Sequence, residues 1–184
     1  MDFTEKKLSE RYYFEGRIMK ARLDEAELPN GKRTTREVCE HVGGVGILPI
    51  DDEGNVILVR QFRYPFAEMM LEIPAGKLDH GPNEDHRDCG ERELKEETGC
   101  TADELTYLGC IYPSPGFLTE VTHLYAARGL HQGEVQPDED EFLELVRIPV
   151  EELEQMIVDN EVRDAKTVAA MYRARLKGLL DGRR

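Results

Sequence analysis

The stretch that most constrains this chain is residues 76–100, GKLDHGPNEDHRDCGERELKEETGC. Asn83 is predicted to cap a helix, because an Asn side chain at that position accepts a hydrogen bond from an unpaired helix N–H. Gly99 is predicted to end the helix, since Gly tolerates the left-handed turn that follows a helix end. Between these two residues lie seven carboxylates and three Lys or Arg side chains. The predicted helix is therefore strongly acidic.

At about 100° per residue, the acidic side chains of this helix divide between two faces. One face has the composition of an ordinary solvated surface: Glu84, Asp88, Glu91 and Lys95. The other face places Glu93, Glu96 and Glu97 at the inward edge, where like charges repel and resist desolvation. A hard cation relieves this conflict, and Mg²⁺ suits one or two carboxylates together with substrate phosphates. A charged surface helix without a metal is the alternative interpretation.

The same stretch resembles the Nudix box, whose pattern is G-x5-E-x7-R-E-U-x-E-E-x-G-U, with U an apolar residue. The residues that fit this pattern in order are Gly76, Glu84, Arg92, Glu93, Leu94, Glu96, Glu97, Gly99 and Cys100. One departure exists, because seven residues rather than five separate Gly76 from Glu84. The additional residues fall in the loop before the helix, and the half that bears the metal ligands keeps its spacing.

The resemblance implies an α/β protein, a Nudix α/β/α sandwich with an N-terminal antiparallel β-sheet extension. Residues 1–41 would form the extension, for dimerisation and substrate contacts, and residues 42–184 the Nudix hydrolase domain. Within the extension, residues 29–32 are a strong turn signal between two extended runs. A hairpin this polar is marginal alone. In the family that the chain resembles, this N-terminal sheet helps to form a dimer. We therefore expect a homodimer.

Local patterns predict the remaining elements. Residues rich in β-branched side chains predict two strands within 42–59, on either side of a turn at 51–55. Further strands are expected at 105–112, 122–128 and 142–148, and helices at 150–158 and 164–180, with Asp164 as the cap of the last helix. The apolar residues that fit a helical period on this last helix are Val168, Met171, Tyr172, Leu176 and Leu179.

The resemblance also assigns a metal site. Glu93 and Glu97 would hold Mg²⁺, with Mn²⁺ as an alternative ion and the carbonyl of Ala75 as a backbone ligand. Glu96 would bind a second ion or support the first, and Arg92 would orient the neighbouring glutamates.

Two arginines resemble the phosphate-contacting arginines of the ADP-ribose pyrophosphatase branch of this family, Arg36 and Arg63. The similarity runs from TTRE through VRQFRYP and EIPAGKLD to the box. Guanidinium groups fork onto phosphate oxygens, and a chain with a net charge of −14 needs such cations to bind a diphosphate. Surface ion pairs, the usual role of arginine, are the alternative.

Two loops after the box complete the predicted site. Pro115 lies sixteen residues after Gly99, where this branch carries a proline in the loop that frames the substrate, and Glu120 in the same loop is a further substrate-binding candidate. The branch also places a glutamate, as general base or added metal ligand, in the loop that corresponds to residues 137–142. Glu141 matches best and Glu139 is second. A simple turn and a solvated acidic loop are the alternatives.

The base-binding part of the site is less defined. Some relatives stack adenine on tryptophan, and this chain has none. Tyr12, Tyr13 or Phe14 could supply a ring, although core packing is the more ordinary role for such residues.

The function implied is Mg²⁺-dependent hydrolysis of ADP-ribose to AMP and ribose 5-phosphate. One alternative is another nucleoside diphosphate sugar, such as GDP-mannose, because the box recognises only the diphosphate. The other is a catalytically silent Nudix module that senses a nucleotide and regulates a partner.

Composition limits the partners. The net charge of −14 disfavours nucleic acids and anionic membranes, whose phosphates would be repelled. No apolar run approaches the ~20 residues of a membrane span. The N-terminus lacks the apolar core of a secretory signal, and the four cysteines lack metal-binding spacing. We therefore expect a cytoplasmic enzyme with reduced thiols that acts on a small nucleoside diphosphate sugar.

Overall fold

The computed structural model describes residues 2–81, 84–135 and 142–181. Its internal contacts divide the chain into two compact units, and each is described by itself. The first consists of Met1–Gly43 and Tyr112–Val121, and the second of Gly44–Ile111 and Thr122–Arg184.

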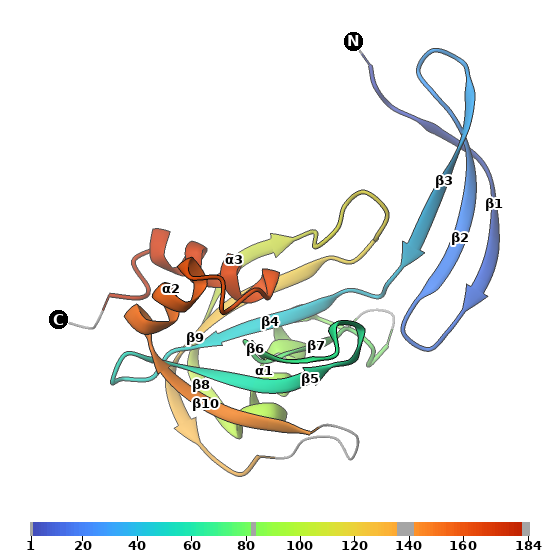
Figure 1. Ribbon diagram of the computed structural model, residues 1–184. Coiled ribbons are helices and arrows are strands. Elements are labelled where there is room, and N and C mark those ends of the chain that lie inside the picture. The colour runs from blue at the N-terminus through green and yellow to red at the C-terminus, as the bar shows by residue number, and fades with distance from the viewer. Residues whose placement is uncertain (1, 82–83, 136–141, 182–184) are drawn as a thin grey trace. The chain divides into compact units, whose positions relative to one another are not determined.

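The first unit is built on an antiparallel sheet with the strand order β1-β2-β3 (Figure 1). Its strands are β1 (Lys6–Glu15), β2 (Lys20–Glu27) and β3 (Arg33–Glu40). The predicted turn at 29–32 joins β2 to β3, closed by hydrogen bonds between Leu28 and Lys32 and between Gly31 and Leu28, both 2.8 Å. The segment 112–121 adds to the end of β3, where the backbone of Cys39 bonds to that of Phe117 and Thr119.

The second unit contains a four-stranded sheet in the order β7-β4-β9-β8 and a three-stranded sheet in the order β10-β5-β6. Only β4 and β9 pair in parallel among these described strands. The strands are β4 (Gly44–Pro49), β5 (Asn55–Arg63), β6 (Glu68–Glu72), β7 (Ala75–Lys77), β8 (Cys100–Ile111), β9 (Thr122–Gln132) and β10 (Leu143–Pro149), with a short 3₁₀ helix η1 (Tyr64–Phe66) after β5.

Helices cover both faces of the four-stranded sheet. They are α1 (His86–Thr98), α2 (Val150–Val158) and α3 (Ala165–Leu176). Every residue of β4 is buried, as expected for a strand between two layers. Val45 and Ile47 pack in the same apolar cluster as Leu94 of α1, whereas Leu48 packs with Met171 of α3. Figure 1 shows α1 on one side of this sheet and α2 and α3 on the other, which is the predicted α/β/α arrangement.

One local prediction about the helices is wrong, and another is correct only in part, because Met171 of the predicted apolar face of α3 is buried. The cap of α1 is Asp85, whose side chain accepts hydrogen bonds from the N–H groups of Arg87 and Asp88; Asn83 lies outside the described residues. Asp164 does cap α3, but the buried face of this helix consists of Thr167, Ala170, Met171 and Ala174. The periodic Tyr172 and Leu176 are exposed instead. Among the described residues, we find no helix with the length and apolar character needed to cross a membrane.

Candidate active site

Helix α1 brings two carboxylates into the interior of the second unit. Asp85 holds its first turn, and Gly99, with a φ of 73°, ends it in the left-handed conformation that glycine favours. The inward face then buries Glu93 and Glu97, which are 8% and 3% exposed. They are four positions apart in the sequence, so they lie one helical turn apart on the same side. Glu96 is different, because its side chain remains 37% exposed.

Both buried carboxylates lie against strand β7. The N–H of Ala75 donates a 3.0 Å hydrogen bond to Oε2 of Glu97. The carboxylate of Glu93 packs directly on the backbone of Gly76, since a Cβ placed there would come within 1.9 Å of Glu93 Oε1. Gly76 therefore leaves the room in which the Glu93 carboxylate lies. The structure thus places Ala75, Glu93 and Glu97 side by side.

Arg92 lies among three carboxylates. Its Nη1 contacts Glu93 Oε1 at 2.7 Å and Glu96 Oε2 at 2.9 Å, and its Nη2 contacts Glu84 Oε1 at 3.2 Å. Partial burial disfavours the charged guanidinium, but the charge of Glu93 and the hydrogen bonds that Arg92 donates to Glu84 and Glu96 outweigh it and raise the pKa of Arg92. Arg92 thus contacts both Glu93 and Glu96, the two glutamates that it is predicted to orient.

This donor set fits a magnesium ion. Carboxylate oxygens are the hard ligands that Mg²⁺ prefers, and Glu93 and Glu97 place two of them one helical turn apart. Within the described ranges, no three His, Cys, Asp or Glu side chains converge into a closed metal cluster. Mg²⁺ does not require one, because it keeps several waters and binds through one or two carboxylates plus substrate phosphates. Glu93 and Glu97 with the adjacent backbone of Ala75 are suited to that role.

Arg63, whose side chain is 39% exposed, forms an ion pair with a buried glutamate that the sequence did not reveal as its partner. Its Nε and Nη2 donate to Oε1 and Oε2 of Glu72, at 2.6 and 2.7 Å. Glu72 is 1% exposed and also contacts the ammonium of Lys166. Burial alone would raise the pKa of Glu72, but the hydrogen bond from Arg63 and the charge of Lys166 lower it to about 2. Glu72 was missed because a lone acid in EIPAG has no periodic signal.

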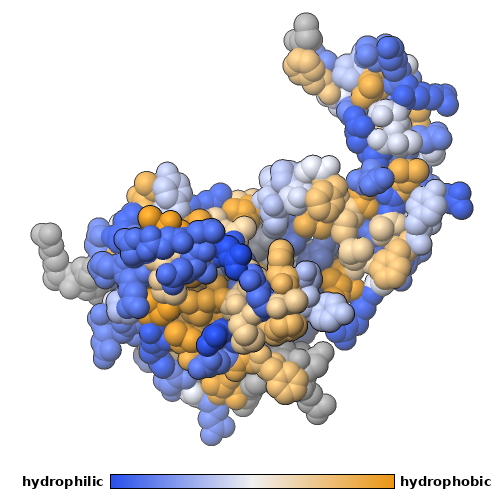
Figure 2. All heavy atoms as spheres, in the orientation of Figure 1, coloured by the Kyte–Doolittle hydropathy of each residue, from blue (hydrophilic) through white to orange (hydrophobic). Residues whose placement is uncertain are grey.

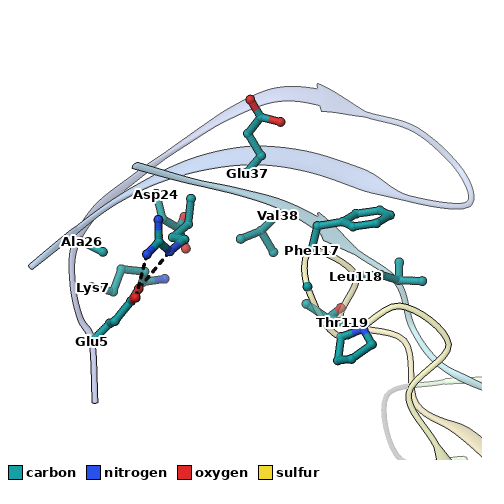
Figure 3. A pocket seen from close by; sticks show the side chains of 12 residues that line it. Glu5, Lys7, Asp24, Ala26, Glu37, Val38, Phe117, Leu118 and Thr119 are labelled. Atoms are coloured by element: carbon teal, nitrogen blue, oxygen red, sulfur yellow. Dashed lines mark hydrogen bonds and ion pairs between the residues drawn. The ribbon is translucent and has the colours of Figure 1, made fainter. Parts of the chain in front are cut away.

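The first unit holds two other predicted site residues. Arg36 and Pro115 line one cavity of about 320 Å³, together with Lys7, Asp24 and the segment around Phe117 (Figure 3). The Arg36 guanidinium donates two hydrogen bonds to the carboxylate of Glu5, from Nε to Oε2 at 2.9 Å and from Nη2 to Oε1 at 2.7 Å. They are drawn as dashed lines in Figure 3. These hydrogen bonds raise the pKa of Arg36.

The remaining predictions have different outcomes. Glu120 is half-buried at the end of the same segment as Pro115. Glu139 and Glu141 lie outside the described residues, so the structure leaves their role as a prediction. Tyr12, Tyr13 and Phe14 are 37%, 62% and 53% exposed, so the core-packing interpretation is wrong for them.

Comparison with known proteins agrees with this geometry. Residues 40–171 match the family described as NUDIX domain, and residues 5–39 match the nucleoside diphosphate sugar hydrolase N-terminal domain. The chain is 38% identical to an ADP-ribose pyrophosphatase of Bacillus subtilis (strain 168), over 98% of this chain and 97% of that protein.

Two further relatives carry other names. A methanol dehydrogenase activator of Bacillus methanolicus is 39% identical, with 97% of this chain and 96% of that protein covered. A GDP-mannose pyrophosphatase of Yersinia enterocolitica is 37% identical, with 79% and 80% covered. Among solved structures, one described as the crystal structure of an ADP compounds hydrolase superposes with a TM-score of 0.84 at 27% identity, covering 97% of this chain and 98% of that one.

Proposed function

The chain belongs to the NUDIX domain family, and we propose that it hydrolyses the diphosphate of ADP-ribose to AMP and ribose 5-phosphate with Mg²⁺ as cofactor. The observation that carries this proposal is the pair of buried carboxylates, Glu93 and Glu97, held against the backbone of β7. Two buried carboxylates one helical turn apart supply the oxygen ligands that Mg²⁺ prefers, and buried acidic side chains of this kind are frequent at functional sites. The relative named as an ADP-ribose pyrophosphatase, similar over almost the whole chain, supports the choice of substrate.

Each site residue has a role in this reaction. Glu93, Glu97 and the Ala75 carbonyl would hold Mg²⁺, and Glu96 would support it or hold a second ion. Bound Mg²⁺ would screen the diphosphate oxygens and lower the pKa of the attacking water. Arg92 keeps Glu93 and Glu96 oriented through its 2.7 and 2.9 Å contacts.

The bond changes follow from the substrate. Water adds to one phosphorus, the bond from that phosphorus to the bridging oxygen breaks, and a general base takes a proton from the water. Glu141 is the proposed base, and Glu139 is the second candidate.

Cations and loop residues would bind the substrate. Arg63 would contact the diphosphate with the N–H groups that point away from Glu72, since a guanidinium has five and Glu72 accepts from two of its nitrogens. Arg36, Pro115 and Glu120 are also proposed as substrate-binding residues. The shared cavity that Arg36 and Pro115 line supports this assignment.

Two alternatives have specific support. The relative named as a GDP-mannose pyrophosphatase favours a different nucleoside diphosphate sugar, whereas the relative named as a dehydrogenase activator favours action on a partner protein. A substrate panel that includes ADP-ribose and GDP-mannose shows which of these two substrates the enzyme prefers. If the wild type binds nucleotides but hydrolyses no member of the panel, the result would support action on a partner protein.

We also propose that the enzyme works as a cytoplasmic homodimer. Its four cysteines are free thiols, as is usual for proteins of a reducing compartment. The first unit exposes every residue of β1, and an isolated three-stranded sheet with little buried surface is marginally stable. Figure 2 shows hydrophobic side chains among the polar ones on the surface of this sheet.

The test compares hydrolysis of ADP-ribose with and without Mg²⁺ by the wild type, Glu97→Gln and Glu91→Gln. Glu91 is an exposed acid of the same helix and serves as the matched control. We expect Glu97→Gln to lose at least about 10²-fold in turnover, because even the outer partners of metal ligands are worth about 10–100-fold. Its fold should survive, because Gln can still accept the bond from Ala75. Near-normal activity of Glu97→Gln at saturating Mg²⁺ would contradict the metal assignment.

A further inference from the structure

Glu72 connects Arg63 to helix α3. It ends strand β6 and is 1% exposed, and its two oxygens hold two cations that come from different elements. Arg63, the last residue of β5, occupies both oxygens, and Lys166 of α3 contacts Oε2. Oε2 is therefore shared between the guanidinium and the ammonium. A buried carboxylate with two cationic partners has little freedom to rotate, so the guanidinium that it holds is also fixed.

Lys166 is itself held in place by the start of α3. The cap residue Asp164 accepts hydrogen bonds from Lys166 Nζ at 3.0 Å, from the N–H of Thr167 at 2.9 Å and from Thr167 Oγ1 at 2.6 Å. Thr167 Oγ1 in turn accepts from the N–H of Ile73 at 2.9 Å, directly after Glu72. The first turn of α3 thus contacts both the side chain of Glu72 and the backbone next to it, and the side chain of Lys166 is only 14% exposed.

The charges also matter. Two cations, Arg63 and Lys166, face two carboxylates, Glu72 and Asp164. Without Lys166, Arg63 would be the sole cation on Glu72, and the Glu72 carboxylate would attract the Arg63 guanidinium more strongly. With Lys166 in place, the guanidinium keeps more of its attraction for another anion. Arg63 then has both the orientation and the charge that a diphosphate requires.

We propose that Lys166 is a positioning residue, which acts through Glu72 to hold the Arg63 guanidinium in the orientation that binds the substrate's diphosphate. This inference rests on the proposed function, because it takes Arg63 as a phosphate contact. Lys166 itself does not touch the substrate in this proposal. Its loss should therefore weaken substrate binding while the metal-dependent step remains intact.

The first test is steady-state kinetics of Lys166→Met with ADP-ribose. We expect KM to rise about tenfold, in the range of a weakened charge-assisted contact, with kcat changed less than about threefold. Half-maximal activation by Mg²⁺ should stay the same. Lys166→Arg should restore most of the affinity, because it supplies a cation at the same place. Lys177→Met, an exposed lysine at the other end of α3, is the matched control and should behave like the wild type.

A double-mutant cycle distinguishes positioning from a merely structural role. If Lys166 acts through Arg63, Lys166→Met should change KM less than about twofold in an Arg63→Ala background. An equal tenfold effect in both backgrounds, or an unchanged KM in the wild-type background, would overturn the inference. Thermal melts show that each variant is folded, and Lys166→Gln, which keeps an N–H donor, replaces Lys166→Met if that variant is not.

Calorimetric binding of ADP-ribose without Mg²⁺ separates this inference from the proposed function. The dissociation constant should rise in Lys166→Met and in Arg63→Ala, and the two effects should not add. If the wild type hydrolyses no member of the substrate panel, the proposed function fails, and these dissociation constants still test the role of Lys166. Additive effects, or binding that is insensitive to Lys166, would contradict the role.

Discussion

At the scale of single residues, three glutamates are buried in the part of the chain that the structure describes, and each is compensated in a different way. Glu72 is held by two cations, Glu93 contacts Arg92, and Glu97 accepts a hydrogen bond from the backbone of Ala75. Burial of a carboxylate is expensive unless it is paired or hydrogen-bonded. Two cations hold Glu72 in place, whereas Glu93 and Glu97 lie against the backbone of β7, and we propose that they act as metal ligands.

Glu72 should make the protein sensitive to acid. Its pKa is lowered from an ordinary value of 4.5 to about 2, because its cationic partners outweigh burial. A lowered folded-state pKa stabilises the protein fully above the unfolded value and loses that effect as pH falls from about 4.5 towards 2. The shift contributes about 3 kcal/mol to the free energy of unfolding, at about 1.4 kcal/mol per pKa unit. Urea unfolding of the wild type should therefore show a decline across this window.

The control for this prediction is Glu72→Gln, which cannot titrate at that position. Its free energy of unfolding should be lower at pH 7 and should decline less between pH 4.5 and 3. Parallel pH profiles for the two proteins would show that Glu72 is not the group responsible.

The two loop glutamates lead to a second residue-scale prediction. Glu141 directly precedes the apolar Phe142 in the sequence, whereas Glu139 lies deeper in a run of acidic residues, and a base must be held closely to act. We expect Glu141→Gln to lower turnover by about 10²–10⁴-fold, the usual effect of a lost general base. Glu139→Gln should cost clearly less. Turnover of both variants at saturating ADP-ribose and Mg²⁺ is the measurement.

The reverse order of these two effects would assign the base to Glu139. Two mild effects would place it elsewhere, with Glu96 and Glu120 as the next residues to substitute.

At the scale of elements, the site depends on how α1 lies against β7. The helix is held at its start by Asp85 and at its end by Gly99, and Gly90 lets it approach Val45 of the sheet closely, with 3.3 Å from a Cβ placed there to Val45 Cγ2. Strand β7 consists of only three residues, yet it supplies the backbone that both buried carboxylates contact. The spacing between helix and strand therefore sets the position of the carboxylates.

Gly76→Ala tests this arrangement. The new Cβ would lie within 1.9 Å of Glu93 Oε1, so the carboxylate must move away from β7. We expect the Mg²⁺ concentration for half-maximal activity to rise about tenfold or more, the effect of disturbing the surroundings of a metal site. Lys77→Ala, which removes only the partly exposed contact with Asp79, is the control on the same strand. An unchanged Mg²⁺ titration for Gly76→Ala would mean that Glu93 is not a ligand.

At the scale of the whole molecule, the two units differ in how they are stabilised. The second unit contains both apolar core clusters. The first unit has a sheet whose β1 buries no residue, and it exposes large apolar side chains: Tyr13, Phe14, Ile18, Val42 and Phe117. Exposed apolar surface on a small sheet is typical of a protein interface. A second copy of the chain is the occupant that we propose.

Light scattering at low micromolar concentration should therefore give about twice the chain mass of 21.0 kDa. Ile18→Arg, at a side chain that is 54% exposed in the first unit, should shift the protein towards the monomer mass because it places a charge in the proposed interface. Leu176→Arg, at a side chain that is 69% exposed on α3, should leave the mass unchanged. A wild-type mass near 21.0 kDa would contradict the dimer.

The sequence by itself determined the features that depend on local spacing. The box predicted helix α1, its glycine end and the inward direction of Glu93 and Glu97, because helical period and capping chemistry act over a few residues. The turn at 29–32, the cap at Asp164 and the bounds of α2 followed from equally local signals.

Tertiary structure decided the features that depend on neighbours distant in sequence. The apolar period of α3 suggested Tyr172 and Leu176 as core residues, but the helix packs through Ala170 and Ala174. Glu96 lies on the same face of the helix as Glu93 and Glu97, but its side chain contacts Arg92 and stays partly exposed. Glu72 and Lys166 are 94 residues apart, and no sequence period connects them. Their contact exists only because α3 folds back onto the end of β6, where burial makes each charge require the other.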